Sequence, residues 1–310
     1  MPTNAYLTTA AIGNREDLID VIYNVAPTDT PLISMMDKVE ANGVTHEWQR
    51  DTLDTPANNT TAEGADATYT AVTPTQRLSN QTQIARKTFS ISDTQEKVRK
   101  AGRKSEIRYQ TILKGKALRK DMELSLMENP TLTTGATRQA RGMRGWTQSN
   151  NSLGAGGVAP TSIGGNVAPT DGTLRTFAES HLRDAVRLAY IAGGNPTTLM
   201  LHPTIKQNAG AAFTGGTSTR FVQIADRKLE STFDFYDTDF GQIKVVPNRV
   251  LSRTRDGYLI DPDMVALAVL RDMETTELAR IGSARNYMLE CEYTLECREE
   301  RAHASIRDLQ

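Results

Sequence analysis

The stretch SDTQEKVRKAGRKSEIRYQTILKGKALRKDMELSLMEN, residues 92–129, decides the fold, because it predicts one long helix. Ser92 followed by Gln95 three residues later is a capping signature for its first free backbone N–H groups. Proline cannot continue a helix, so the helix ends at Asn129-Pro130. At ~1.5 Å per residue it would be about 50 Å long, and Gly102 is a point where it could bend or where its first turns could be split off. Apolar residues recur through it at roughly helical spacing, at Val98, Ala101, Ile107, Ile112, Leu113, Ala117, Leu118, Met122 and Leu126.

The polar face of this helix is basic over most of its length. Acidic residues gather near its C-terminal end, at Asp121, Glu123 and Glu128, where the helix dipole disfavours them. Helix stability alone does not explain this order. Two interpretations stay open: a solvated charged face, or a surface laid against phosphate or against acidic neighbouring subunits. The candidate residues for a DNA-facing or inner surface are Lys97, Arg99, Lys100, Arg103, Lys104, Arg108 and Lys116.

The segment before the helix predicts a long polar β-hairpin. Residues 44–51 alternate as a strand does, with His46 and Trp48 on one face, and a second strand is predicted over residues 77–91. The segment between them, DTLDTPANNTTAEGADATYTAVTPTQ, cannot bury enough apolar surface to offset its ordering entropy. An isolated two-stranded ribbon is marginal in water, so the hairpin is either mobile or held by another molecule. Its only large apolar residues are Leu53, Tyr69 and Val72.

Charge on the hairpin is divided between its parts. The second strand is net basic and the tip is net acidic, which suits docking on a neighbour of opposite local sign. The basic start of the long helix on an adjacent subunit is a candidate receiver for Glu63 and Asp66. The hairpin is therefore expected to be the main inter-subunit element. Its candidate contact residues are Trp48, Arg50, Asp54, Glu63, Asp66, Arg77, Arg86 and Lys87.

The chain on either side of these elements is an arm and a long polar stretch. Residues 15–24 (REDLIDVIYN) predict a short amphipathic helix in an N-terminal arm that packs on its own domain and, as we expect, also crosses to a neighbour. Residues 131–173 are rich in Gly, Asn, Thr and Ser, with Trp146 but little else to bury. Loops of this length are usually functional or disordered.

The next region mixes helices with short strands, which indicates an α+β region. Residues 174–192 predict an amphipathic helix, capped by Thr173 or Asp171 and stopped by Gly193-Gly194. A buried strand is expected at residues 197–201, followed by a short helix from Pro203 through Ala212. Further strands are expected at FDFYDTD (233–239), GQIKVVPN (241–248) and GYLIDP (257–262).

The tail contains the clearest strand, because apolar residues alternate without interruption from Tyr287 to Cys297. Residues 264–270 and 276–281 are its probable sheet partners. Cys291 and Cys297 are the only cysteines, which points to synthesis in a reducing cytoplasm. Six residues apart on one strand, they lie about 20 Å apart. A disulfide needs Cα atoms within about 7 Å, so both should be free thiols.

Composition excludes several classes. The net charge is −1, no run of about 18 apolar residues predicts a membrane span, and MPTNAYLTTA lacks the pattern of a secretory signal. The four histidines are scattered, and no metal, P-loop, dinucleotide or nucleophile-elbow motif occurs. Asp261-Pro262-Asp263 offers a carboxylate pair, but a turn explains it better. The sequence predicts no enzyme, no metal and no cofactor.

Taken in order, these elements resemble the major capsid proteins of tailed bacteriophages with the HK97-type fold. The most specific matches are ISDTQEKVRKAGR, which opens the helix, and AYIAGGNPTTLMLHPTIKQ. The resemblance implies an α+β fold in which the hairpin is the extended E-loop and the helix is the spine of a peripheral P domain. It divides the chain into an arm (1–43), the E-loop hairpin (44–92), the first part of the P domain (93–172), an axial A domain (173–262) and C-terminal strands returning to the P domain (263–310).

The resemblance implies a shell protein that self-assembles, as pentamers and hexamers, into an icosahedral phage head around double-stranded DNA bound without sequence preference. Portal, scaffolding and decoration proteins would be further partners. The protein would be made and assembled in the host bacterial cytoplasm and would end in the virion capsid. The alternative is an oligomeric nucleic-acid-binding protein that uses residues 97–120, but the balanced charge and the lack of interleaved aromatics disfavour it. An enzyme with an unrecognised site has no support from any residue.

Overall fold

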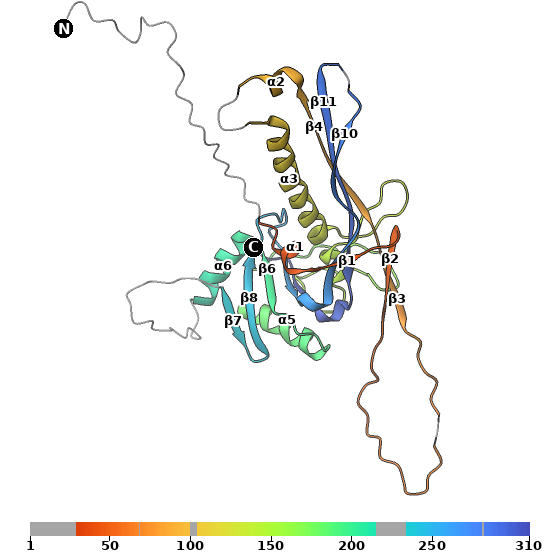
Figure 1. The fold of residues 1–310 in the computed structure, drawn as a ribbon. Coiled ribbons are helices and arrows are strands. Elements are labelled where there is room, and N and C mark those ends of the chain that lie inside the picture. The colour runs from red at the N-terminus through yellow and green to blue at the C-terminus, as the bar shows by residue number, and fades with distance from the viewer. Residues whose placement is uncertain (1–28, 68, 100–103, 215–233, 281) are drawn as a thin grey trace, which may run out of the picture.

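The computed structural model describes residues 29–67, 69–99, 104–214, 234–280 and 282–310. The helix expected at residues 15–24 lies outside these described residues. The described chain forms a four-stranded sheet, a six-stranded sheet and a separate two-stranded hairpin that projects from the body (Figure 1). Helices pack against the two larger sheets, so the architecture is a mixed α+β fold.

The four-stranded sheet has the order β1 (Asp37–Glu40), β10 (Val265–Leu278), β11 (Ala284–Cys297), β4 (Gln83–Ser92). β10 and β11 form a long antiparallel hairpin in which Val265 lies opposite Cys297. β4 pairs antiparallel with the other edge of β11, and β1 pairs parallel with β10. The predicted tail strand and its partner strand are therefore confirmed. Cys291 and Cys297 are buried free thiols, as predicted.

The single helix predicted over residues 92–129 is wrong, because two helices occupy this stretch: α2 (Asp93–Lys97) and α3 (Glu106–Glu128). The Ser92 side chain caps α2 as predicted, by accepting a hydrogen bond from the Gln95 backbone N–H. The backbone is extended at Val98, where α2 ends. Ser105 then caps α3 anew by accepting from the Arg108 N–H, so a second capping serine accounts for the separate helix. Gly102 lies outside the described residues.

The second strand predicted at residues 77–91 is also two strands, which belong to different sheets. β3 (Gln76–Gln81) pairs with β2 (Thr45–Arg50) in the hairpin, while β4 joins the four-stranded sheet. The cause lies at the junction, where Asn80 and Thr82 are fully buried. The Asn80 amide donates to two backbone carbonyls of the body, and Thr82 Oγ1 donates to Glu292 at 2.7 Å. These bonds attach the chain to the body exactly where it leaves the hairpin.

The six-stranded sheet confirms the strands predicted in the second half of the chain. Its order is β5 (Asn151–Ser152), β12 (Ala304–Ile306), β9 (Gly257–Ile260), β6 (Thr198–Leu201), β8 (Gly241–Pro247), β7 (Phe235–Thr238). Helix α5 (Glu179–Ile191) buries Leu182, Ala185, Val186 and Ala189 against it. Helix α6 (Pro203–Thr214) follows β6, also as predicted.

Helix α5 starts five residues later than predicted, at Glu179 instead of Leu174. The expected caps are engaged elsewhere: Asp171 binds arginine side chains, and the Thr173 N–H donates to the Ala155 carbonyl. The Arg175 N–H then donates to the Asp308 carbonyl. The chain before α5 is thus held in an extended form against the C-terminal segment. Gly193, at φ +93°, ends the helix as predicted.

Two buried apolar clusters form the core. One joins the C-terminal half of α3 and the four-stranded sheet to α1 (Pro31–Met35) and α4 (Met143–Trp146). The other lies between α5 and the six-stranded sheet. Two short 3-10 helices, Pro262–Met264 and Glu300–Ala302, lie on either side of the β10–β11 hairpin in the sequence, and Asp261 caps the first, so the predicted turn is confirmed.

Candidate inter-subunit surfaces

The base of the hairpin is fixed to its own subunit. Trp48 packs on Trp146 with ring centroids 5.5 Å apart, and His46 Nε2 lies 2.7 Å from a Glu296 carboxylate oxygen. Arg50 donates to Glu299 at 2.9 Å, and its side chain is only 9% exposed. Trp48 and Arg50 therefore make their observed contacts within their own chain. A contact between either residue and a neighbouring subunit stays a prediction.

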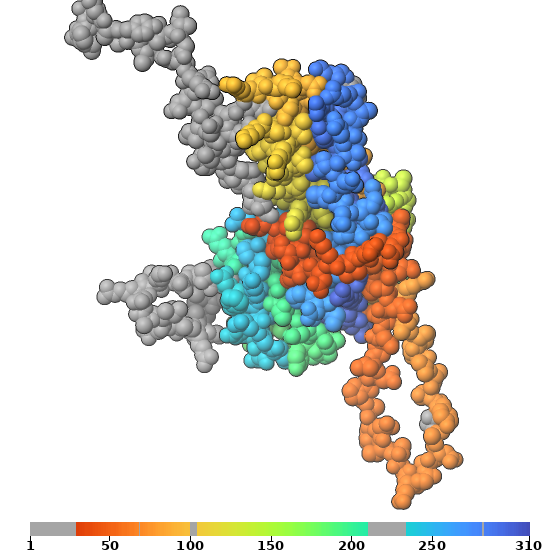
Figure 2. Space-filling model, viewed as in Figure 1, coloured from red at the N-terminus to blue at the C-terminus, as the bar shows by residue number. Residues whose placement is uncertain are grey.

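The loop of the hairpin, residues 51–75, has the opposite character. Each of its described residues is exposed, and the loop projects well beyond the body of the molecule (Figure 2). Leu53, Tyr69 and Val72 are 100%, 96% and 93% exposed. The predicted contact residues Asp54, Glu63 and Asp66 lie along it. The hydrogen bonds of its described residues reach only neighbours in the loop or the strands beside it, such as the bond from Thr60 to Asn58. Nothing in the described part of its own chain covers the loop.

The remaining predicted hairpin contacts are basic residues on β3 and β4, and the structure does not bring them together. Arg77 is largely exposed and lies 3.5 Å from Glu47 across the hairpin. Arg86 is exposed on β4, with its guanidinium 4.0 Å from Met288 Sδ. Lys87 forms an ion pair with Asp121 of α3 at 2.6 Å. Lys87 thus joins sheet to helix, while Arg77 and Arg86 remain accessible.

The predicted basic surface is exposed on α2 and α3. Lys97, Arg99, Lys104, Arg108 and Lys116 are all exposed, while Lys100 and Arg103 lie outside the described residues. Within the described chain no ion pair joins these five cations to a carboxylate. Exposed cations without a partner can bind a multivalent anion or an acidic protein surface. Their charge is therefore available to another molecule.

The acidic end of α3, which helix stability did not explain, attaches other segments to the helix. Glu123 is fully buried, and its carboxylate accepts from the backbone N–H groups of Leu32 and Ile33 and from the Asn248 amide. Glu128 accepts from Ser252 and the Arg253 N–H. These two carboxylates hold α1 and the β8–β9 connection. Burial raises the pKa of Glu123, although the hydrogen bonds to Ile33 and Leu32 oppose that shift.

A buried network of arginines and aspartates, which sequence reasoning missed, holds the long stretch after α3. Arg141 is 2% exposed and donates to the carbonyls of Ser162 and Gly165 and to the Asn166 side chain. The Asp308 carboxylate accepts from the Gly154 and Gly172 N–H groups and from Arg255. The only sequence signal for this network was the cluster of arginines itself, which surface charge would explain equally well.

Asp171 shows the electrostatics of the same network. Its carboxylate lies within 2.8 Å of both Arg144 and Arg253. Burial alone would raise the pKa of Asp171, but the Arg253 hydrogen bond and the Arg144 charge outweigh it, so this pKa is lowered. Asp171 therefore stays ionised and joins the long stretch to the β8–β9 connection.

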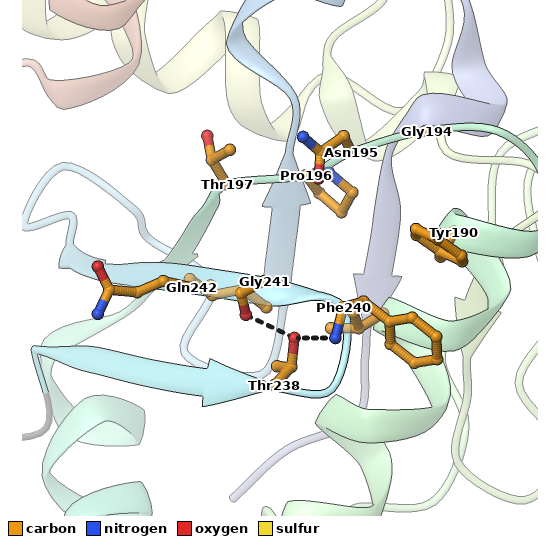
Figure 3. Close-up of a pocket in the computed structure, with 11 residues that line it drawn as sticks. Tyr190, Gly194, Asn195, Pro196, Thr197, Thr238, Phe240, Gly241 and Gln242 are labelled. Carbon is orange, nitrogen blue, oxygen red and sulfur yellow. Dashed lines mark hydrogen bonds between the residues drawn. The ribbon is translucent and has the colours of Figure 1, made fainter.

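A small pocket lies between the end of α5 and the turn that joins β7 to β8 (Figure 3). Its volume is about 180 Å³, and the rings of Tyr190 and Phe240 lie 4.6 Å apart beside it. Thr238 Oγ1 accepts from the Phe240 N–H and donates to the Gly241 carbonyl. Its lining contains no carboxylate, histidine, cysteine, lysine or arginine, and its one ionisable side chain is Tyr190. The described residues also hold no cluster of three potential metal ligands. None of the helices within the described ranges is both long and apolar enough to span a membrane.

Comparison with known proteins gives consistent similarities. A family model described as SU10 major capsid protein matches residues 2–310. A major capsid protein of Escherichia phage Phieco32 is 28% identical over 332 residues, which cover 94% of this chain and 93% of that protein. Among solved structures, the capsid of a native GTA particle has a TM-score of 0.67 at 11% identity and covers 98% of both chains. The capsid asymmetric unit of Cyanophage A-1(L) has a TM-score of 0.65 at 13% identity, again over 98% of both chains.

Proposed function

The chain belongs to the SU10 family of major capsid proteins, and on that basis we propose how its surfaces build a phage shell. It is a major capsid protein with the HK97-type α+β fold, and it forms the capsid shell of a bacteriophage. The family is a structural one. We propose that the protein has no catalytic role and that its function lies in contacts between copies.

The proposed shell is icosahedral, built from pentamers and hexamers, and encloses double-stranded DNA. Assembly would take place in the host cytoplasm, with portal, scaffolding and decoration proteins as further partners. The proposed division of the chain is the one the resemblance implies: arm 1–43, E-loop hairpin 44–92, P domain 93–172, A domain 173–262 and returning strands 263–310. Two strands cross these bounds, because β4 joins the four-stranded sheet and β12 joins the six-stranded sheet. The fixed hairpin base and the exposed loop support a hairpin that is built to reach a neighbour.

The single observation that carries the proposal is the exposure of residues 51–75 in a chain that forms shells. Three large apolar side chains there are at least 93% exposed. An exposed large apolar side chain forgoes about 1.5–3 kcal/mol that burial would provide. A partner that covers all three gains this energy, and repetition around a closed shell multiplies it.

Deletion of residues 54–74 tests this role. Because the segment contacts no core residue, the variant should stay soluble, with the helical circular dichroism of the parent protein. It should fail to form stable shells by sedimentation and negative-stain microscopy. Normal shells from this variant would show that the hairpin loop is not the inter-subunit element.

On charge alone, packaged DNA is the first candidate ligand of the basic surface. Phosphates attract lysine and arginine without reading sequence, and the attraction weakens with salt. Replacing Arg103, Arg108 and Lys116 with glutamine should lower salt-sensitive DNA association while empty shells still assemble. Unchanged DNA content and unchanged salt dependence would contradict a DNA-facing role.

A further inference from the structure

The outer edge of β10, on the side away from β11, is covered over only part of its length. β1 pairs with this edge from Ala266 to Val269, and the Ala41 N–H makes the last bond, to the Val269 carbonyl at 2.9 Å. Past Val269, no strand among the described residues pairs with the edge, although β10 continues to Leu278 and is exposed from Arg271 onward. Alternate residues of an antiparallel edge strand direct their N–H and carbonyl groups away from the partner strand. The edge therefore offers unpaired backbone groups to a further strand.

The end of this edge is regular. The register between β10 and β11 shifts between Val269 and Glu274, and it then runs without interruption from Glu274 to Leu278. β10 contains no lysine or proline, the residues with which proteins commonly block an exposed edge. Thr275 and Thr276 are β-branched and favour an extended backbone. A further strand can thus pair here without any rearrangement of β10.

The open edge is acidic. Asp272, Glu274 and Glu277 are exposed, and none of the three forms an ion pair within the described chain. Arg271, the one cation from residue 271 to 278, is bound to two carboxylates of β11 at 2.7 and 3.0 Å. Two copies of this edge would repel each other, because like charges would meet across the new strand pair. The charge of the edge therefore favours a basic strand.

A groove of about 530 Å³ lies beside the open edge. Met273 and Met288 give it flexible apolar surface, which suits the aliphatic stem of a lysine or arginine side chain. The rest of its lining is Thr276, the paired Arg271 and three carboxylates: Asp272, Glu274 and Glu290. When a strand is added to a sheet edge, backbone hydrogen bonds supply affinity and recesses for its side chains supply specificity. The groove thus offers acceptors for the cationic head of such a side chain.

We propose that the open edge of β10, from Arg271 to Leu278, receives an extended basic segment of a second protein. This segment would add a strand to the four-stranded sheet, next to the point where β1 leaves it. A second copy of this chain fits less well, because its own basic surface lies mainly on the helices α2 and α3. The edge lies at the end of the molecule opposite the loop (Figure 1), so the proposal goes beyond the inter-subunit role of the hairpin and does not depend on it.

A synthetic peptide in which lysine alternates with threonine or valine tests the edge. One control replaces each lysine with glutamate, and a second methylates every backbone nitrogen, which keeps the charge but removes the N–H donors. By fluorescence anisotropy, the basic peptide should bind the full-length unassembled subunit. Each control should bind at least about tenfold more weakly. Equal binding of the methylated peptide would overturn strand addition, because charge alone would then explain the binding.

Charge reversal locates the site. Glu274→Lys with Glu277→Lys should weaken binding of the basic peptide by at least about tenfold and allow the glutamate peptide to bind. Glu63→Lys with Asp66→Lys is the matched control, because it changes the net charge equally in the irregular loop, and it should alter binding by no more than about twofold. Bound peptide should also slow the amide hydrogen exchange of residues 274–278. Unchanged exchange there, or equal weakening in both variants, would overturn the assignment.

Assembled shells identify the kind of occupant. If the edge receives a second protein, the basic peptide should bind shells as well as subunits. Binding to the subunit but not to the shell would mean that a neighbouring copy already covers the edge, and it would overturn the assignment to a second protein. A failure of the proposed hairpin role would leave the binding to the unassembled subunit unchanged, so the two failures are distinguishable.

Discussion

Two long polar stretches of this chain read alike in sequence and differ completely in structure. Residues 51–75 and residues 131–173 are both poor in large apolar side chains. The first is exposed along its described length, whereas the second contains a fully buried run from Ala140 to Thr147. Hydrogen bonds between buried side chains and the backbone hold the second stretch. For example, Arg141 donates to the Ser162 carbonyl, and the Gly154 N–H donates to the Asp308 carboxylate. The described residues of the first stretch have no such bonds, in line with the proposal that its partners come from another copy.

The comparison teaches that apolar content alone does not decide whether a polar stretch is ordered. A backbone that lacks apolar neighbours can still be fixed if buried charged side chains satisfy its polar groups. The buried side chains of Arg141 and Asp308, together with the partly buried Arg255, satisfy backbone groups within residues 131–173 in this way. In the proposed function, contacts with neighbouring copies in the shell would satisfy the polar groups of the loop.

The largest expected effect comes from removing Arg141, which would break the ordered stretch. Arg141→Ala leaves the buried Ser162 carbonyl and the partly buried Gly165 carbonyl without their donor, and it removes a cation that lies 4.9 Å from the Trp146 ring. The unassembled subunit should lose about 3–5 kcal/mol of unfolding free energy in urea. Arg77→Ala is the control, because Arg77 is 72% exposed at the hairpin, and it should cost about 0.5 kcal/mol or less. Equal losses in both variants would mean that buried arginine does not order this stretch.

A pH effect of similar size is expected at His303, which lies beside the same stretch. Burial lowers the pKa of His303 to about 4, and the Asn150 amide donates to its backbone carbonyl. Between pH 6.5 and 4 the His303 side chain is protonated in the unfolded chain but neutral in the folded chain. The free energy of unfolding therefore falls as the pH falls. The loss through that window should be about 3 kcal/mol. In His303→Gln, the free energy of unfolding in urea should depend less on pH than it does in the parent protein. Parallel curves for the two proteins would contradict the burial argument.

Two glycines offer a matched pair between the stretches. A Cβ at Gly154 would lie 2.2 Å from the Thr173 carbonyl oxygen, whereas a Cβ at Gly64, in the loop, meets nothing within 4 Å. Gly154→Ala should cost about 2–3 kcal/mol of subunit stability through overpacking. Gly64→Ala, at φ +79°, should cost no more than about 1 kcal/mol, from backbone conformation alone. Thermal unfolding of both subunits measures this, and a larger cost at Gly64 would show that the loop packs on its own body.

The smallest expected effect on the subunit is that of Tyr69→Ser. Tyr69 is 96% exposed, so its removal should change subunit stability by less than about 0.5 kcal/mol. The same change should lower shell yield, because the lost apolar contact is made only in the assembly. If Tyr69→Ser destabilised the subunit and left shell assembly intact, the loop would pack within its own chain, which contradicts the role assigned to it.

The sequence predicted the family, the fold class, the tail strand, whose apolar alternation is strong, and β6, β7, β8 and β9 of the six-stranded sheet. It missed β5 and β12, which are only two and three residues long. It merged α2 with α3 because the competing cap at Ser105 looks like any serine within a charged helix. It merged β3 with β4 because the buried side chains of Asn80 and Thr82 look like ordinary strand residues. It located the exposed loop and the basic surface, but the buried Arg–Asp network requires contacts between residues far apart in the chain.

Hydrogen exchange of the loop tests the central claim most directly. Amide exchange of residues 51–75 should be measured in the unassembled subunit and in the assembled shell, with residues 140–147 as an internal reference. Because buried side chains hold the reference segment within its own chain, its exchange should be slow in both states. The loop should exchange at nearly unprotected rates in the subunit and at least tenfold more slowly in the shell. Equally fast loop exchange in both states would contradict the claim that other copies hold it.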